Sequence, residues 1–127
     1  MGKVKFEKIK LQNLTIIKRT FYGSINIPEI IDTFKKILED EQVINKTIKV
    51  IISDVSDANL NFNIKEFKTL ISFIKNDKIL SNLKLAVIVD SPKKTIFPSL
   101  ASSIIGVKIK PFSTISGALE WAKTTKL

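Results

Sequence analysis

The sequence predicts a small α/β protein in which helices cover a mainly parallel β-sheet. Runs of β-branched residues alternate along the chain with segments in which apolar residues recur at helical spacing. Strands separated by helices are joined by crossover connections, which place the strands parallel to one another. The length of 127 residues is typical of one domain, and no linker or repeat divides the chain, so we expect a single domain over residues 1–127.

The N-terminal third predicts a β-hairpin followed by a helix. Apolar and charged residues alternate over residues 4–11, and a second β-rich run covers residues 14–22. Asn26, with Glu29 three residues later, forms a capping box. We expect the helix that it opens to run to about residue 42.

The rest of the chain predicts strands and helices in alternation. Two runs are nearly continuously apolar, as in strands that are covered on both faces. The expected elements are a strand at 47–53, a helix opened by the capping box of Asn63 and Glu66, a strand at 83–89, a helix over 96–104, a strand at 107–112 and a last helix capped by Ser113 or Thr114. The expected order is therefore β-β-α-β-α-β-α-β-α, a mixed sheet with an N-terminal antiparallel hairpin.

The chain contains no cysteine and no histidine. This excludes a thiolate nucleophile, a disulfide, a zinc site with sulfur or imidazole ligands and a Ser-His-Asp triad. Carboxylate, lysine and hydroxyl chemistry, or Mg²⁺ and Ca²⁺ bound by oxygen, would remain for an enzyme. Because no such motif is complete, we expect no enzymatic activity, no cofactor and no bound metal.

The net charge of +9 suggests nucleic acid, but its distribution does not. Lysines lie along the whole chain and Arg19 is the only arginine, whereas base-specific reading depends on the bidentate arginine fork. We expect no specific nucleic-acid partner. No apolar run approaches the ~18 residues of a membrane span, and the N-terminus lacks the apolar region of a signal peptide, so we expect a cytoplasmic protein without a membrane span.

The element order and the ending IKPFSTISGALEWAKTTKL resemble the STAS domains, the anti-sigma-factor antagonist fold, and especially a branch of small stand-alone bacterial proteins. The residues that match this branch are Phe112, Ser113, Thr114, Ala118, Leu119 and Trp121. The resemblance implies a STAS-like sandwich and a non-enzymatic protein that binds another protein, or a small apolar or anionic ligand. In the best-known members a serine is phosphorylated, but residues 61–64 here read Asn-Phe-Asn-Ile, so that switch is not carried over.

The stretch IISDVSDANLNFN, residues 51–63, contains most of the candidate chemistry. Asp54 and Ser56 partly fit a metal-dependent adhesion site, but Ala58 removes one ligand. A phosphotransferase loop would need an acid where Ser56 stands. An EF-hand would need Gly and Glu where Asn59 and Lys65 stand. The alternative is structural: the short polar side chains bind nearby amides, and Asn63 caps the next helix.

A second group of residues keeps a binding site open at the carboxyl edge of the sheet, where open α/β sheets bind ligands. Asp54 and Asp90 each end a predicted strand there, and basic residues after Asp90 suit an anion. Leu60 and Phe62 either anchor a partner or fold onto the core, and Trp121 poses the same choice. The candidate binding residues are Asp54, Ser56, Asp57, Leu60, Phe62, Asp90, Lys93, Lys94 and Thr95.

Three functions follow from these observations. The first, which we favour, is a binding or regulatory module that contacts a protein partner, a second copy of itself, or a small apolar or anionic ligand. The second is an Mg²⁺-dependent enzyme that uses Asp54 on a phosphate compound. The third is a carrier of an apolar, lipid-like ligand, because the STAS fold resembles the lipid-transfer CRAL-TRIO architecture. A carrier needs a cavity of about a few hundred Å³, lined by residues such as Phe34, Phe67 and Phe97.

Overall fold

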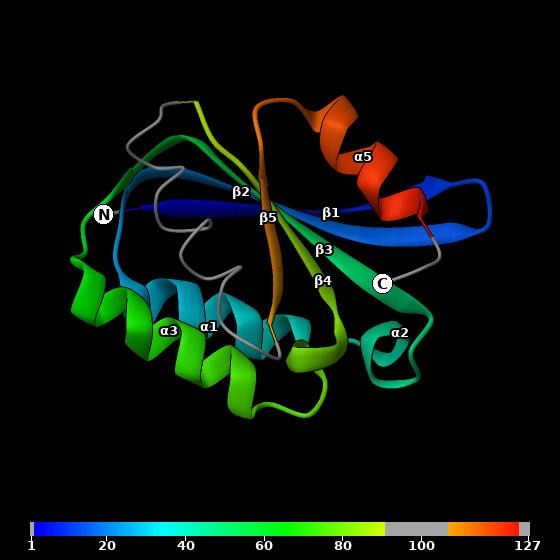
Figure 1. Ribbon diagram of the computed structural model, residues 1–127, viewed down its shortest axis with the longest axis horizontal. Coiled ribbons are helices and arrows are strands. Elements are labelled where there is room, and N and C mark those ends of the chain that lie inside the picture. Colours follow the sequence, from blue (N-terminus) through cyan, green and yellow to red (C-terminus); the bar gives the residue numbers. More distant parts are fainter. Residues whose placement is uncertain (1, 91–106, 125–127) are drawn as a thin grey trace.

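A five-stranded sheet with helices on both faces forms the protein in the computed structural model, which describes residues 2–90 and 107–124 (Figure 1). In sheet order the strands are β1 (Lys3–Leu11), β2 (Leu14–Ile25), β3 (Ile48–Leu60), β4 (Lys84–Ile88) and β5 (Lys108–Phe112). The β1–β2 pair is antiparallel and the other neighbours are parallel. The predicted mixed sheet is therefore confirmed.

The described helices are α1 (Ile27–Ile37), α2 (Glu41–Ile44), α3 (Ile64–Asn76) and α5 (Ile115–Lys123), with a 3₁₀ turn at Leu80–Asn82. Both predicted capping boxes are confirmed, Asn26 with Glu29 and Asn63 with Glu66. The expected extent of the first helix is wrong, because α1 ends at Ile37 and Asp40 caps the separate helix α2. The helix expected over 96–104 lies outside the described residues.

Strand β3 is longer than the sequence pattern predicts. It was expected to end at residue 53, but it continues to Leu60. The extension follows from pairing with β2, which runs to Ile25 and stays in register with β3 up to the Ile25–Leu60 pair. Between Thr20 and Tyr22 the register shifts, and β3 contains one extra residue between Asp54 and Asp57. At a β-bulge of this kind the extra residue is unpaired and the strand bends.

Two apolar clusters hold the helices on the sheet. The larger one packs the sheet against α1 and α3, and the smaller one packs the other face against α5. Figure 1 shows this arrangement, with α1 and α3 on one side of the strands and α5 on the other. Burial on both faces explains why β3 and β4 read as continuous apolar runs.

Arg19 of β2 links the sheet to α1 from within the larger cluster, where it is only 3% exposed. Its Nε donates to the Ser53 hydroxyl on β3 at 2.7 Å, and its Nη1 donates to the Thr33 hydroxyl on α1 at 2.6 Å. The guanidinium carbon lies 3.7 Å from the centre of the Phe34 ring, as in a cation–π contact. One side chain therefore ties β2, β3 and α1 together.

Lys84 of β4 links the sheet to α5 on the opposite face, where the lysine side chain is buried. Its Nζ donates to the backbone carbonyls of Trp121 at 2.9 Å and Thr124 at 2.8 Å, and to the Thr124 hydroxyl. These carbonyls lie at the C-terminal end of α5, where a cation complements the helix dipole. The contact fixes the position of that helix end on the sheet.

Replacement of Asn63 by alanine tests the cap of α3. The Asn63 side chain accepts from the Glu66 amide at 2.8 Å, so we expect Asn63→Ala to lower the free energy of unfolding. The expected loss is about 1 kcal/mol in urea denaturation. Asn61→Ala is the matched control, since Asn61 is an exposed asparagine of the same connection. Equal losses in the two variants would contradict the capping role.

Candidate functional site

Asp54 and Ser56, the first predicted site residues, hydrogen-bond to each other. The Asp54 Oδ1 accepts from the Ser56 amide at 3.0 Å and from the Ser56 hydroxyl at 2.6 Å. Both bonds lie at the bulge of β3 rather than in a loop. The polar atoms that suggested chemistry therefore stabilise a local irregularity of the strand. Asp57 is exposed and lies beside Tyr22 of β2.

Asp54 and Asp90 were expected to end neighbouring strands, but Asp54 does not lie at the end of a strand. The expectation is wrong for Asp54, because β3 continues to Leu60. Asp54 aligns with Ile88, the last residue of β4, and exposed Asp90 follows two residues later. Lys93, Lys94 and Thr95 lie outside the described residues. Within the ranges 2–90 and 107–124, no three acidic side chains gather in a way that could hold a metal ion.

The apolar candidates pack onto the two clusters. Leu60 and Phe62 are partly buried against the larger cluster, and the Phe62 ring stacks with that of Phe67 at a centroid distance of 6.2 Å. Trp121 is partly buried against the smaller cluster, with its ring 5.6 Å from that of Phe112. These side chains are thus at core margins and do not project as free anchors.

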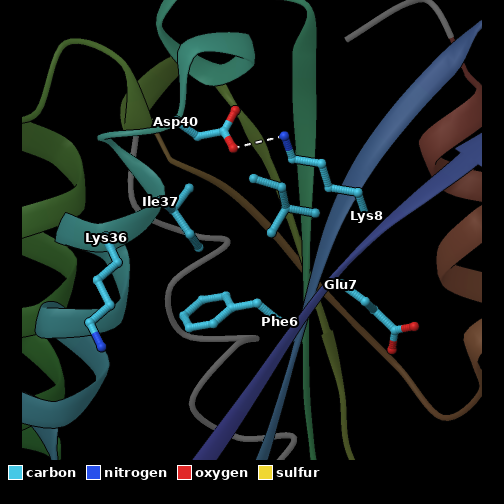
Figure 2. A pocket seen from close by; sticks show the side chains of 7 residues that line it. Phe6, Glu7, Lys8, Lys36, Ile37 and Asp40 are labelled. Carbon is cyan, nitrogen blue, oxygen red and sulfur yellow. Dashed lines mark ion pairs between the residues drawn. The ribbon is translucent and has the colours of Figure 1, made fainter.

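A surface groove between β1 and α1 is a site that sequence reasoning missed (Figure 2). Its volume is about 350 Å³. Ile17 and Ile37 form an apolar floor, and Phe6 of β1 is 39% exposed beside it. In Figure 2 the Phe6 ring points from β1 toward α1, where Ile37 and Lys36 lie. The groove thus presents the Phe6 ring to solvent above two nearly buried isoleucines, Ile17 and Ile37.

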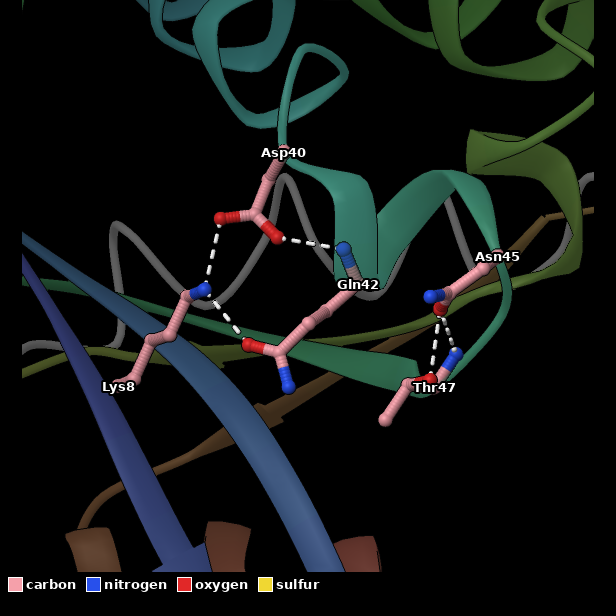
Figure 3. A network of polar contacts seen from close by, with 5 residues as sticks. All are labelled: Lys8, Asp40, Gln42, Asn45 and Thr47. Carbon is pink, nitrogen blue, oxygen red and sulfur yellow. Dashed lines mark hydrogen bonds and ion pairs between the residues drawn. The ribbon is translucent and has the colours of Figure 1, made fainter.

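Charged residues form the rim of the groove, and one pair of them is fixed in place (Figure 3). The Lys8 Nζ lies 2.8 Å from the Asp40 Oδ2 and donates to the Gln42 Oε1 at 2.7 Å. The Asp40 Oδ1 accepts from the Gln42 amide at 2.9 Å. The hydrogen bond from Lys8 lowers the pKa of the Asp40 carboxyl. This network joins β1 to the start of α2.

Lys36 adds a positive charge to the rim of the groove. Its side chain is exposed, and no described residue forms an ion pair with it. The Oε1 of Glu7, the other rim carboxylate, lies 3.8 Å from the Nζ of Lys18. The only sequence signal for this site is Phe6, an aromatic residue among the lysines of an edge strand. Its exposure depends on where α1 lies.

A cavity for the apolar-carrier hypothesis exists but is small. It lies between the sheet and the helices α1 and α3, and Phe34 and Phe67 line it as expected, while Phe97 lies outside the described residues. Its volume is about 70 Å³. Pockets that hold drug-sized ligands begin at roughly 300 Å³. The cavity is therefore too small for a lipid-sized ligand in this structure.

Comparisons with known proteins identify the class of fold. No family model and no curated protein sequence matches the chain. The chain is similar to the solved structure of an uncharacterized DUF3478-family protein with a SpoIIAA-like fold from Shewanella loihica PV-4. That match has a TM-score of 0.64 and 14% identity, and covers 95% of this chain and 94% of that one.

Two anti-sigma factor antagonists are also similar in structure. One, from Mycobacterium paratuberculosis, has a TM-score of 0.58, 12% identity and 96% coverage of both chains. The other is SpoIIAA in its unphosphorylated form, with a TM-score of 0.56, 10% identity, and coverage of 93% of this chain and 97% of that one. The chain therefore has a SpoIIAA-like, STAS fold, and the predicted resemblance is confirmed at the level of the fold. Among the described helices, none combines the length and apolar character needed to cross a membrane.

Replacement of Asp54 tests its role at the bulge. Asp54→Ala removes the acceptor of two hydrogen bonds, so we expect the free energy of unfolding to fall by about 1–2 kcal/mol. Asp54→Asn keeps an oxygen at that position and is expected to lose less than half as much. Chemical denaturation of both variants and of the exposed control Asp57→Ala measures this. Equal losses for alanine and asparagine would show that the carboxylate charge, rather than its acceptor geometry, matters.

Replacement of Lys8 tests the network at the groove. Lys8→Met removes the donor that lowers the pKa of Asp40, so that pKa is expected to rise toward its ordinary value in an NMR titration of the carboxyl group. In the unchanged protein the pair stabilises the fold above the ordinary pKa of an aspartate, and this stabilisation is lost as pH falls through the lowered pKa. Lys10→Met, at an exposed lysine of the same strand, is expected to leave the titration unchanged. An unchanged Asp40 titration in Lys8→Met would contradict the assignment.

Proposed function

We propose that this protein is a non-enzymatic binding module that contacts another protein, and that the groove between β1 and α1 receives a side chain of that partner. The observation that supports this most is the exposure of Phe6 at 39% beside a floor formed by Ile17 and Ile37. Protein interfaces combine such an apolar centre, often aromatic, with a polar rim.

The rim favours a particular kind of partner. The charge of Lys8 is already compensated by Asp40, whereas Lys36 has no described counter-ion. An apolar side chain of the partner would pack on Phe6 and Ile37 while a nearby acidic residue meets Lys36. Electrostatic complementarity of this kind adds specificity and speeds association. The SpoIIAA-like fold is consistent with the proposal, since two structural neighbours are anti-sigma factor antagonists by name.

The carboxyl edge of the sheet is a second proposed contact surface. Asp57 and Tyr22 are exposed there, close along the strands to the other candidates Asp54, Ser56, Leu60 and Phe62. We propose that the contact is not switched by phosphorylation at residues 61–64, since that segment contains no hydroxyl. The Asp54-dependent enzyme gains no support, because the Asp54 Oδ1 already accepts two local hydrogen bonds.

Site-specific photo-crosslinking in the protein's own cells tests this function. A photoreactive phenylalanine analogue replaces Phe6 in one variant and Tyr22 in another. Tyr22 is the matched position, because it is an aromatic residue of similar exposure, 41%, on the opposite face of the sheet. Exposed Lys65 on α3 is the background control. We expect position 6 to give one discrete protein adduct that positions 22 and 65 do not give.

Two other outcomes would contradict the proposal. An adduct from position 22 and none from position 6 would move the contact to the carboxyl edge and show the groove to be wrong. Equal adducts at all three positions, or none, would contradict a specific protein contact. If position 6 gives the adduct, a further pair of variants carries the photoreactive residue at position 36 of the groove. The variant with Phe6 unchanged is expected to form the adduct, and the variant that also carries Phe6→Asp is expected not to form it.

A further inference from the structure

Arg19 has hydrogen-bond donors that the described protein does not use. A guanidinium carries five N–H donors. The Nε donates to Ser53 at 2.7 Å, and the Nη1 donates to Thr33 at 2.6 Å and to the Ile30 carbonyl at 3.4 Å. These three acceptors leave the Nη2 amino group, which donates to no described residue. The side chain is nevertheless 97% removed from solvent, since its exposed fraction is 3%.

No carboxylate of the described residues compensates the charge of Arg19. All three acceptors are neutral, and no carboxylate of the described chain forms an ion pair with the guanidinium. Burial lowers the pKa of Arg19 to about 9, so the group is still charged at neutral pH. The Phe34 and Phe21 rings, 3.7 and 5.0 Å away, stabilise the cation only in part. Buried charges in proteins are usually paired, and an unpaired one is costly.

The unused donor borders open space. Every described side-chain nitrogen or oxygen that is fully closed off has a hydrogen-bond partner. Because Nη2 donates to no described residue, it is not fully closed off, and Arg19 is among the residues that line a cavity. The rest of the described lining is apolar except for Ser53, whose hydroxyl already accepts from Nε. Among the described residues, the wall of this cavity of about 70 Å³ is therefore apolar apart from Ser53 and the Arg19 cation.

We propose that this cavity binds a small aliphatic carboxylate, with its charged end on the Nη2 of Arg19 and its short alkyl chain against Phe34, Leu70 and Val87. This site is separate from the groove and does not rest on the protein contact proposed above.

The size and donor set of the cavity select this class of ligand. A water molecule needs about 10–15 Å³ of such space, and a cavity of about 150 Å³ holds benzene, so 70 Å³ suits a chain of about two to four carbons. The Nη2 amino group of Arg19 can donate to one carboxylate. A hydrogen bond between a guanidinium and a carboxylate is charge-assisted and therefore strong. Phosphate would bring further charged oxygens for which the described lining has no donors. A neutral amide would leave the arginine charge uncompensated.

Thermal unfolding and calorimetry of the full chain test the proposal at pH 7 and constant ionic strength. The probes are sodium acetate, propionate, butyrate and hexanoate, with propionamide, butyramide, chloride and phosphate as comparisons. We expect carboxylates to stabilise the protein saturably, with an affinity that increases from acetate to butyrate. The affinity for hexanoate is expected to be at least tenfold lower than that for butyrate. Stabilisation by the amides, or equal stabilisation by chloride or phosphate, would overturn the proposal, as would no saturable effect of any carboxylate.

Two variants locate the effect without removing Arg19. Leu70→Phe adds volume to the lining of the cavity and is expected to weaken butyrate at least tenfold while the circular dichroism spectrum is unchanged. Leu119→Phe on α5 is the matched control, because Leu119 packs against the other cluster, and its butyrate affinity is expected to stay unchanged. If both variants bind butyrate as the original chain does, the carboxylate binds elsewhere and the proposal is wrong. Arg19→Met is a third variant, expected to lose binding if it folds.

Discussion

The contacts of Arg19 hold helix α1 against the sheet. A single guanidinium joins β2, β3 and α1 through Ser53 and Thr33, and stacks on Phe34. Arginine suits this position because its planar group is weakly hydrated, forms directed hydrogen bonds and packs on aromatic rings. The groove lies on one side of α1, between that helix and β1, and the cavity lies on the other side, toward α3. Both proposed sites therefore depend on the position of α1.

The bulge of β3 gives a structural role to polar side chains that the sequence offers as candidate chemistry. The Oδ1 of Asp54 accepts two local hydrogen bonds, from the amide and from the hydroxyl of Ser56. The extra residue lets β3 follow β2 to Leu60. Bulges often reorient side chains, and here the exposed residue just after the bulge is Asp57. At this point of β3 the Asp54 side chain bonds the backbone and the hydroxyl of Ser56.

Local patterns were enough to predict most of the fold. The capping boxes at Asn26 and Asn63 and the apolar runs of β3 and β4 are properties of short segments, and each was confirmed. The length of β3 could not be predicted, because it depends on a register with β2 set by residues more than thirty positions earlier. The split between α1 and α2 was missed because the apolar spacing continues while Asp40 starts a new helix.

The sites were harder to predict because they depend on burial. A lone arginine and a lysine usually lie at the surface, so the burial of Arg19 and Lys84 has no local signal. Leu60 and Phe62 look like exposed anchors in a polar stretch, yet pairing with Ile25 and stacking on Phe67 place them at the core margin. Phe6 looks like any apolar residue of a hairpin, and only the position of α1 leaves it exposed in a groove.

The central claim is that a charged arginine is held inside the protein by neutral partners. Because Arg19 is the only arginine, its Nε–H group gives one signal in a ¹H–¹⁵N NMR spectrum, and hydrogen exchange of that signal at pH 7 measures its protection directly. The structure predicts a single signal that exchanges far more slowly than that of a free arginine, since Nε–H is buried and bonded to Ser53. Rapid exchange, equal to that of an exposed side chain, would contradict the link between the sheet and α1.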